Sequence, residues 1–504
     1  MKFSNKFLIS LASGLLLLSA CSDEVDNKGK AIDDVYVSFY ITMGYSDGMS
    51  RSGTTTDGGS ESEELEGKDK ECTIETVNLI FCEVQDETDP DPSQDKYLYH
   101  LSETLPTPIV SRKDENTEIS IKITEPKSFL NLIAHKKLRL YLVANKTMVF
   151  YDIDPSTATF SYDVSREELG KCGKNGKILP LINAQASGLL DLSEKSADDI
   201  YEILRKAADN TLNISDENSG IGSVGVITLE RAVARIDFRG HTVNGQISHL
   251  YKLGKEDGDP DVELSLKFIK VLNISSSAYL FKHTVQGDNF SANYLETNKV
   301  NLFGNERGGV SGNYNWVVDT DWGETNSKAD ALSSVAMESK VAKLCNTSIT
   351  HSHSNDGRDG HPMFYVPENT LPSVGFMTPE KLSKYATGLE FTFKLADIDT
   401  ENLPTGLEMV GDKVRITMAD KKWMDVEYDE AVEGYALKYT YYLEHNVPND
   451  WNGSDLQPMH YGVVRNNVYD IMVEEVNNLP DPENPLKVNV RIKPWDYEPA
   501  IVTW

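Results

Sequence analysis

The sequence has little cysteine, less positive than negative charge, and few long apolar runs. Among 504 residues there are five cysteines, too few for a dense disulfide framework. Cys72 and Cys82 could pair with each other, but the expectation is free or buried thiols. Acidic residues outnumber basic residues by 79 to 49, which argues against nucleic acid as a partner because such a surface repels phosphate backbones. After Leu18 no segment is apolar enough to span a bilayer.

Catalytic motifs are also missing. There is no nucleophile elbow, phosphate-binding loop or HExxH run, so we expect neither an enzyme nor a cofactor. His351, His353 and His361 lie in a polar stretch that offers no rigid ligand shell, so no metal site is expected. The pair Asp397 and Asp399 is of a kind that arises by chance in so acidic a chain.

The N-terminus has the pattern of an export signal. Lys2 and Lys6 precede the apolar run Phe7–Leu18, which has the length of a signal-peptide core. The run ends in Leu-Ser-Ala-Cys21, a bacterial lipobox, in which the Cys21 thiol takes a diacylglyceryl group and the new amine is acylated, typically with palmitate. The alternative is a conventional signal peptide with an incidental cysteine. We expect residues 1–20 to be removed and Cys21 to be the lipidation site.

A strongly alternating strand follows this signal. Its apolar residues occur at every second position, which places them on one face of a β-strand. The next stretch, Gly44–Gly67, is rich in Gly, Ser, Thr, Asp and Glu and contains Arg51. One interpretation is an ordinary first strand with a long linker. The other is a removable strand that is released by cleavage after Arg51. The apolar residues of this strand are Val35, Val37, Phe39, Ile41 and Met43.

Most of the remaining chain also has strand character. Short runs of β-branched and aromatic residues recur between polar turns, and two helices are expected to begin at the capping residues Ser165 and Ser196. One long strand is expected over Ile221–Phe238, with the domain junction within or beside it. This pattern predicts an all-β fold with minor helices. Further expected strands are Cys72–Val84, Ile119–Ile123, Leu138–Val143, Gly388–Leu395 and Tyr435–Leu443.

The C-terminus contains a second alternating strand, which follows the strand-breaking segment Asp481–Pro485. Such a strand either closes the sheet of its own domain or pairs outside that domain. Its apolar positions are Leu486, Val488, Val490 and Ile492, and two tryptophans, Trp495 and Trp504, follow them.

Taken in order, these stretches resemble the fimbrillin family of Bacteroidetes type V pili, in particular its Mfa-type subunits. Each stretch is weakly specific alone, and the ordered set covers nearly the whole chain. The resemblance rests on the lipobox at Cys21, the strand Val35–Met43, Ser50-Arg51-Ser52, Gly67–Lys70, Leu229–Arg235, Tyr441–Leu443, Val464–Tyr469 and Lys493-Pro494-Trp495.

The resemblance implies two transthyretin-like β-sandwich domains in tandem and a defined maturation. An outer-membrane lipoprotein precursor would be cut between Arg51 and Ser52 by an Arg-specific protease. The first strand would leave, and the C-terminal strand of a neighbouring subunit would replace it. The mature protein would then lie in a fimbrium at the cell surface and contribute to adhesion. Its partners would be further copies of itself and the tip and anchor proteins.

This resemblance also implies a division of the chain. The expected parts are a signal peptide at 1–20, a lipidated propeptide at 21–51, an N-terminal domain at 52–230, a C-terminal domain at 231–480 and a donor-strand tail at 481–504. Two alternatives stay open: a tip or anchor subunit of the same pilus, and a surface lipoprotein that binds glycans. In the second alternative, Trp316 and Trp322 would stack on sugar rings.

Overall fold

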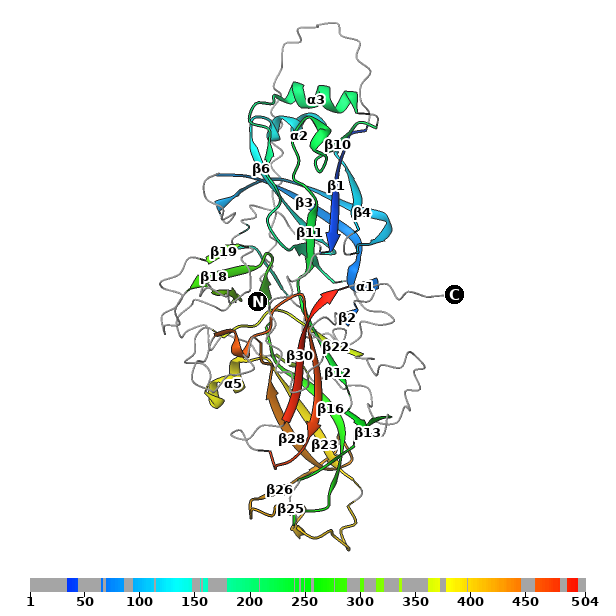
Figure 1. Cartoon of the computed structure of the whole chain (residues 1–504), viewed down its shortest axis with the longest axis vertical. Coiled ribbons are helices and arrows are strands. Elements are labelled where there is room, and N and C mark those ends of the chain that lie inside the picture. Colours follow the sequence, from blue (N-terminus) through cyan, green and yellow to red (C-terminus); the bar gives the residue numbers. More distant parts are fainter. Residues whose placement is uncertain are drawn as a thin grey trace, which may run out of the picture. The chain divides into compact units, whose positions relative to one another are not determined.

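A computed structural model shows a chain built mainly of strands, with a few short helices (Figure 1). The predicted all-β class is therefore confirmed. Among the described residues, no helix is both long enough and apolar enough to span a bilayer. The structure describes residues 34–43, 65–66, 69–85, 94–112, 115–146, 155, 157–161, 179–207, 209–239, 241–243, 246–248, 250–254, 258–275, 277–287, 300–302, 314–320, 335–337, 361–371, 378–396, 398–445, 458–480 and 487–496.

The first large sheet, here called the N-sheet, contains nine strands within these ranges. Its order is β10-β1-β11-β8-β6-β3-β4, with β5 paired to β1 and β9 paired to β6. The strands are β1 (Tyr36–Met43), β3 (Thr73–Glu83), β4 (Lys96–Val110), β5 (Thr117–Lys122), β6 (Lys137–Ala144), β8 (Leu181–Asn183), β9 (Leu190–Asp191), β10 (Thr211–Asn213) and β11 (Ile227–Arg231).

Three helices accompany the N-sheet strands in the chain. They are α1 (Asp69–Cys72), α2 (Pro126–Ile133) and α3 (Ala197–Lys206). The expected helix at Ser196 is confirmed: the Ser196 hydroxyl accepts from the Asp199 N–H, and Asp199 accepts in return from the Ser196 N–H. The sequence analysis missed α2, which buries Phe129 and Leu130 and begins with a proline in its first turn. The helix expected at Ser165 lies outside the described residues.

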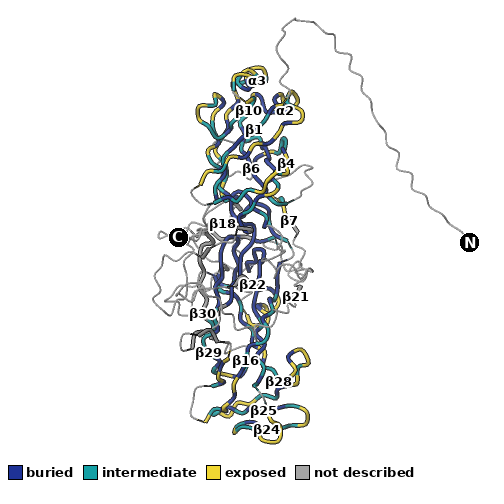
Figure 2. Tube along the Cα trace, turned by 90° about the vertical axis from the view of Figure 1, so that its right-hand side faces the viewer, coloured by how far each residue is buried: buried dark blue, intermediate teal, exposed yellow. Residues whose placement is uncertain are grey.

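Two further sheets pack face to face around a hydrophobic core. Aromatic and aliphatic side chains from both sheets form one cluster, in which the rings of Phe238 and Phe391 lie 6.1 Å apart. Figure 2 shows this core as buried tube along β22 and β16. One sheet, the C-sheet, has the order β2 (Leu65–Glu66), β30 (Lys487–Asp496), β29 (Asn467–Glu475), β12 (Ala234–Arg239) and β22 (His361–Val366). The other contains β15 (Leu250–Lys252), β16 (Glu263–Ile274), β23 (Gly388–Leu395), β28 (Gly434–Tyr442) and β27 (Tyr428–Asp429), with β21 (Val335–Met337) on β16.

Smaller sheets complete the described architecture. They are β7 (Thr159–Ser161) with β17 (Ser277–Tyr279), β13 (His241–Val243) with β14 (Gln246–Ser248), β18 (His283–Gly287) with β19 (Val300–Leu302) and β20 (Tyr314–Val318), and β24 (Leu407–Val410) with β25 (Lys413–Thr417) and β26 (Trp423–Val426). A short helix, α5 (Pro379–Tyr385), precedes β23, and 3-10 turns occur at Glu217–Ser219 and Pro458–Tyr461.

The single strand expected over Ile221–Phe238 is wrong. The segment forms two strands in different sheets: β11 pairs with β1 and β8, whereas β12 pairs with β22 and β29. The break falls at Ala232 and Val233, which are fully buried. The Ala232 N–H donates to the Pro180 carbonyl, and the Val233 carbonyl accepts from the Asn466 N–H. β-Branched composition predicts extended backbone, but it does not show where a chain passes from one sheet to the next.

A half-buried glutamate and a buried histidine follow β28 and make stability depend on pH. Burial raises the pKa of Glu444 from 4.5 to about 7 and lowers the pKa of His445 to about 4. The folded state therefore disfavours ionised Glu444, a penalty that is absent below pH 4.5, grows up to pH 7 and persists above it. The shift corresponds to about 3 kcal/mol at pH 8. His445 acts in the opposite direction, because the unfolded chain takes up a proton between pH 6.5 and 4 while the folded chain does not.

We expect Glu444→Gln to stabilise the protein at pH 8 by up to about 3 kcal/mol, because the neutral amide avoids the buried charge. Thermal melting at several pH values measures this, and the gain should vanish by pH 4.5. The exposed Glu401→Gln variant is the control and should melt like the wild type throughout. A gain for Glu444→Gln that is equal at pH 8 and pH 4.5 would contradict the assignment.

Candidate functional site

The N-terminal strand β1 occupies an internal place in the N-sheet. On one side it pairs antiparallel with β5, and on the other side it pairs in parallel with β10 at its start and with β11 at its end. Figure 1 shows β1 alongside β11. We call the space that Tyr36–Met43 fill between these strands the β1 seat.

The apolar face of β1 is buried as its alternation predicts. Val37, Phe39 and Ile41 are fully buried, and Val35 and Met43 are at most 4% exposed. Val37, Phe39 and Ile41 are paired opposite residues of β5, and Val37, Ile41 and Met43 are paired opposite residues of β10 or β11. Val37, for example, is directly opposite Ile121 of β5 and Leu212 of β10. The five residues therefore act together as one wedge between two strand edges.

Backbone and side-chain bonds at both ends of β1 hold the neighbouring segment of chain. The carbonyl of Arg112, which precedes β5, accepts from the Met43 N–H at 3.2 Å and from the Thr42 hydroxyl at 3.2 Å. At the other end, the Ile123 N–H donates to the Val35 carbonyl at 2.8 Å. Lys122 forms an ion pair with Asp34, and this carboxylate raises the pKa of Lys122. Strand β5 and the residues Arg112 and Ile123 on either side of it are thus bonded to β1.

One buried polar atom on β1 has no partner. Ser38 is fully buried, and its hydroxyl makes no hydrogen bond within the described residues. Leaving a buried hydroxyl unsatisfied costs about 1–3 kcal/mol. By contrast, the Thr42 hydroxyl on the same strand donates to the Arg112 carbonyl. The strand therefore carries an unsatisfied buried hydroxyl near its centre.

We expect Ser38→Ala to raise the free energy of unfolding by about 1–2 kcal/mol, because it removes the unsatisfied hydroxyl. Thr42→Val is the matched control: it removes a hydroxyl that has a partner, and it should lower stability by about 1 kcal/mol. Denaturant unfolding of both variants measures the difference. A Ser38→Ala variant less stable than the wild type would show that the hydroxyl has a partner in solution.

A buried polar cluster lies where the chain passes from the N-sheet to the C-sheet. The Glu71 carboxylate of α1 accepts from Arg235 at 3.2 Å and from the Tyr365 hydroxyl. Arg235 also binds both carboxylate oxygens of Asp237, at 2.7 and 2.6 Å. Burial raises the pKa of Asp237 to about 6, against the opposing effect of Arg235. The cluster fixes α1 to two strands of the C-sheet.

Two of the stretches that carry the family resemblance meet next to this cluster. Arg231 belongs to one stretch and Asn466 to the other, and the Arg231 Nη1 donates to the Asn466 Oδ1 at 3.2 Å. Arg231 also donates to the Glu71 carbonyl, and its Nη2 lies 2.7 Å from Sγ of Cys72. Cys72 and Cys82 are buried and form no disulfide, as expected. Sequence reasoning identified both stretches but not their contact, because no local pattern predicts an arginine that bridges sheets.

The C-terminal strand β30 lies within the chain's own C-sheet. It pairs antiparallel with β29, so that Val490 is opposite Ile471 and Ile492 is opposite Tyr469, and Val488 packs against the core (Figure 1). At its end, Trp495 pairs in parallel with Leu65 of β2. The sequence left open whether this strand closes the sheet of its own domain or pairs outside it; in this chain it lies in its own sheet. The donor role concerns a second copy and stays a prediction.

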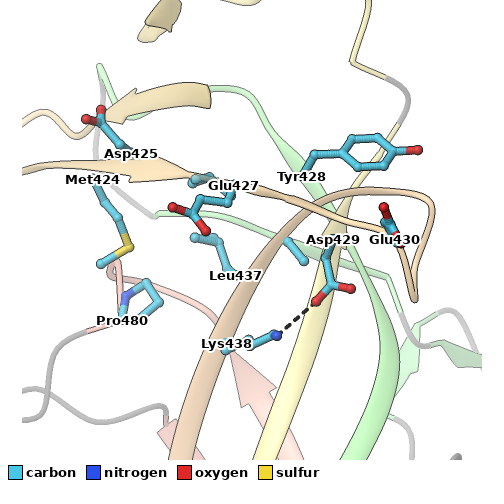
Figure 3. A pocket seen from close by; sticks show the side chains of 11 residues that line it. Met424, Asp425, Glu427, Tyr428, Asp429, Glu430, Leu437, Lys438 and Pro480 are labelled. Carbon is cyan, nitrogen blue, oxygen red and sulfur yellow. Dashed lines mark ion pairs between the residues drawn. The ribbon is translucent and has the colours of Figure 1, made fainter. Parts of the chain in front are cut away.

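A shallow pocket of about 490 Å³ lies at the start of the tail. Residues of β26, β27 and β28 line it together with Pro480, which precedes the strand-breaking segment. Figure 3 shows several carboxylates around it, among which Asp429 pairs with Lys438 at 2.9 Å. This ion pair lowers the pKa of Asp429. Because Asp425, Glu427 and Asp429 are all engaged in ion pairs, we assign the pocket no ligand.

Other residues singled out in the sequence have different outcomes. Asp399 serves a local turn: its carboxylate accepts from the Glu401 N–H and from the Asn402 side chain. His361 begins β22, and Trp316 lies in β20 opposite Val285. No group of metal-ligating side chains occurs among the residues that the structure describes. The predicted sites at Cys21, Arg51, Ser52, Leu486 and Trp504, together with Trp322, His351, His353 and Asp397, lie outside those residues.

Comparison with known proteins finds likeness only among solved structures. No family model and no curated protein matches the chain. A fimbrilin from Porphyromonas gingivalis matches over 92% of this chain and 98% of its own, with 13% identity and a TM-score of 0.39. The chain is similar to fimbrial proteins. The tip fimbrial protein Mfa3 of the same organism, with a C-terminal truncation, matches over 92% and 100% of the two chains, with 10% identity and a TM-score of 0.32. A fimbrial assembly protein from Parabacteroides distasonis matches over 91% and 98%, with 11% identity and a TM-score of 0.29.

Proposed function

We propose that this chain is a structural subunit of a fimbrium and that it polymerises by strand exchange. In this proposal the precursor is an outer-membrane lipoprotein anchored through Cys21, and an Arg-specific protease cuts it between Arg51 and Ser52. The C-terminal segment of another copy then takes the place of β1. The proposal keeps the expected division into a propeptide (21–51), two sandwich domains (52–230 and 231–480) and a tail (481–504).

One observation carries the proposal: an N-terminal strand fills an internal seat between two strand edges. Because β5 bonds to one edge of β1 and β10 and β11 bond to the other, removal of β1 leaves two unpaired edges facing each other. A strand entering this space would bond to both, which is β-augmentation on two sides. The vacated core positions would give such a strand its register.

The energies of seating and ordering such a strand are comparable. Burial of five apolar side chains contributes roughly 8–15 kcal/mol at ~1.5–3 kcal/mol each. Ordering the nine residues Val35–Met43 costs about 1–2 kcal/mol per residue for the backbone alone. One strand can therefore replace another without an external energy source, and the unsatisfied Ser38 hydroxyl favours a replacement that lacks it.

We expect lipid on Cys21 in the precursor and none in the assembled form, because cleavage after Arg51 separates the anchor from the body of the subunit. Two measurements test this: labelling of cells with a fatty-acid probe, and the subunit mass in the purified surface assembly by mass spectrometry. The expected mass is that of residues 52–504, without label. A labelled assembly that begins at Cys21 would instead indicate an anchor subunit or a glycan-binding lipoprotein.

A further inference from the structure

The geometry points to a closed state of the cut subunit, in which β5 moves sideways into the β1 seat and pairs antiparallel with β10 and with the first residue of β11. The movement corresponds to one strand spacing, about 4.8 Å. This inference rests on the proposed function, since it concerns the subunit after β1 has left and before another strand arrives. It adds a state in which the subunit blocks its own seat.

Strand β5 is attached to the N-sheet through β1. Within the described residues, β1 is the strand with which β5 forms a ladder. The residues on either side of β5 are also bonded to β1, since the Arg112 carbonyl accepts from the Met43 N–H and the Ile123 N–H donates to the Val35 carbonyl. Loss of β1 therefore releases β5 from its ladder and breaks the bonds of Arg112 and Ile123 to β1.

The direction and the faces of β5 suit the seat. β5 runs antiparallel to β1, and β1 runs parallel to β10 and β11, so β5 is already antiparallel to both. Ile121 lies opposite Val37, which lies opposite Leu212. A sideways movement without sliding along the strand therefore brings Ile121 directly opposite Leu212, with both side chains on the core face.

The alternation of backbone hydrogen bonds along β1 also suits direct pairing of β5 with β10. The Val35 carbonyl accepts from the Ile123 N–H, next to β5. On the other side, the Tyr36 N–H donates to the Asn210 carbonyl and the Ser38 carbonyl accepts from the Ile214 N–H. Alternate residues of β1 thus bond to opposite sides, and Ile121 and Leu212 both direct their backbone groups into the seat. Without β1, these two edges can bond to each other in the same register.

Closure has a physical driving force. Departure of β1 exposes Ile119 and Ile121 on one edge and Leu212, Ile227 and Leu229 on the other, all buried in the intact chain. Two unpaired apolar edges favour aggregation with any available strand. Pairing β5 with β10 and with Ile227 at the start of β11 covers most of the two edges, so the closed state would keep cut subunits apart until a donor strand reopens the seat.

A pair of engineered cysteines distinguishes the closed state from the intact one. Ser120 of β5 and Asn213 of β10 flank Ser38 on opposite sides, two strand spacings or about 10 Å apart. A disulfide needs Cα atoms roughly 4.4–6.8 Å apart. In the closed state the two residues become direct neighbours at about 4.5 Å. The control pair is Ser38→Cys with Ser120→Cys, which are neighbours in the intact chain.

The experiment uses the full chain before and after an Arg-specific protease, with size-exclusion separation, mild oxidation and peptide mapping by mass spectrometry. For Ser120→Cys/Asn213→Cys we expect no disulfide before cleavage and nearly complete linkage after the N-terminal fragment has left. The locked product should not assemble, and reduction should restore assembly. Lys122→Cys/Thr211→Cys, which flank Tyr36 in the same way, serves as the second variant if the first does not fold.

The outcomes separate this inference from the proposed function. If the fragment leaves and neither Ser120→Cys/Asn213→Cys nor Lys122→Cys/Thr211→Cys forms a disulfide, the closed state is wrong while strand exchange stands. If the fragment stays bound after cleavage and the control pair Ser38→Cys/Ser120→Cys still links, β1 is a permanent strand. That result overturns the proposed function, and the closed state with it.

Discussion

An Arg51→Ala precursor is expected to reach the cell surface and to form no fimbriae. Cleavage after Arg51 is the step that disconnects β1 from the body of the subunit, and an intact loop would return the strand to its seat at a very high local concentration. Since β1 bonds on both edges, no donor strand can enter while β1 is in place. The measurement is the polymer ladder on a gel of surface extracts, together with the mass of the monomer, which should retain residues 21–51.

Two matched variants make this result specific. Arg51→Lys keeps the positive charge and should behave like Arg51→Ala, because the processing enzyme is specific for arginine. Ser50→Ala changes the neighbouring residue and should assemble normally. Normal polymerisation of Arg51→Ala would eliminate cleavage at this position as the trigger.

A peptide of residues 481–504 is expected to stop assembly of cut subunits when added in excess, and the same peptide with Val490→Asp should be inactive. The tail alternates, so Val490 would enter the core face of the seat, where an unpaired carboxylate costs several kcal/mol. At about 3 kcal/mol, this corresponds to a loss of affinity of more than a hundredfold. Polymer length as a function of peptide concentration gives the measurement.

Adding the tail as a peptide measures its binding to the β1 seat without changing the C-sheet of the subunit. Within the chain itself, Val490 is paired opposite Ile471, so a full-chain variant would change a residue of the C-sheet as well as of the donor. The Asn489→Asp peptide is the control, because this residue faces the other side and the change should be tolerated. Equal inhibition by both mutant peptides would show that the tail does not fill the seat by its alternating face.

The sequence correctly predicts elements that are encoded by a local pattern, such as strand alternation or a helix cap. The alternation of Val35–Met43 correctly predicts a strand whose apolar side chains are buried, and the Ser196 capping pattern correctly predicts α3. The same kind of evidence failed at Ile221–Phe238, where extended backbone continues through a change of sheet. Local composition encodes the strand, whereas the crossing depends on bonds from distant residues such as Asn466.

The candidate site was predictable only in part for the same reason. The sequence indicates which side chains of β1 are buried, but not that β5, β10 and β11 enclose it, since those partners lie about 70 to 190 residues away. The unsatisfied Ser38 hydroxyl looks in the sequence like any polar residue of an alternating strand. The sequence also left two arrangements open for the tail, which in this chain pairs with β29.

The most direct measurement of the central claim places a photo-cross-linking amino acid at Ser120, the exposed β5 residue opposite Ser38. In the precursor, the cross-link should form with residues 35–43. In the purified polymer, strand exchange predicts a cross-link between position 120 of one copy and residues 487–504 of another, identified by mass spectrometry with isotopically mixed subunits. A cross-link to residues 35–43 that persists in the polymer would contradict the exchange of β1.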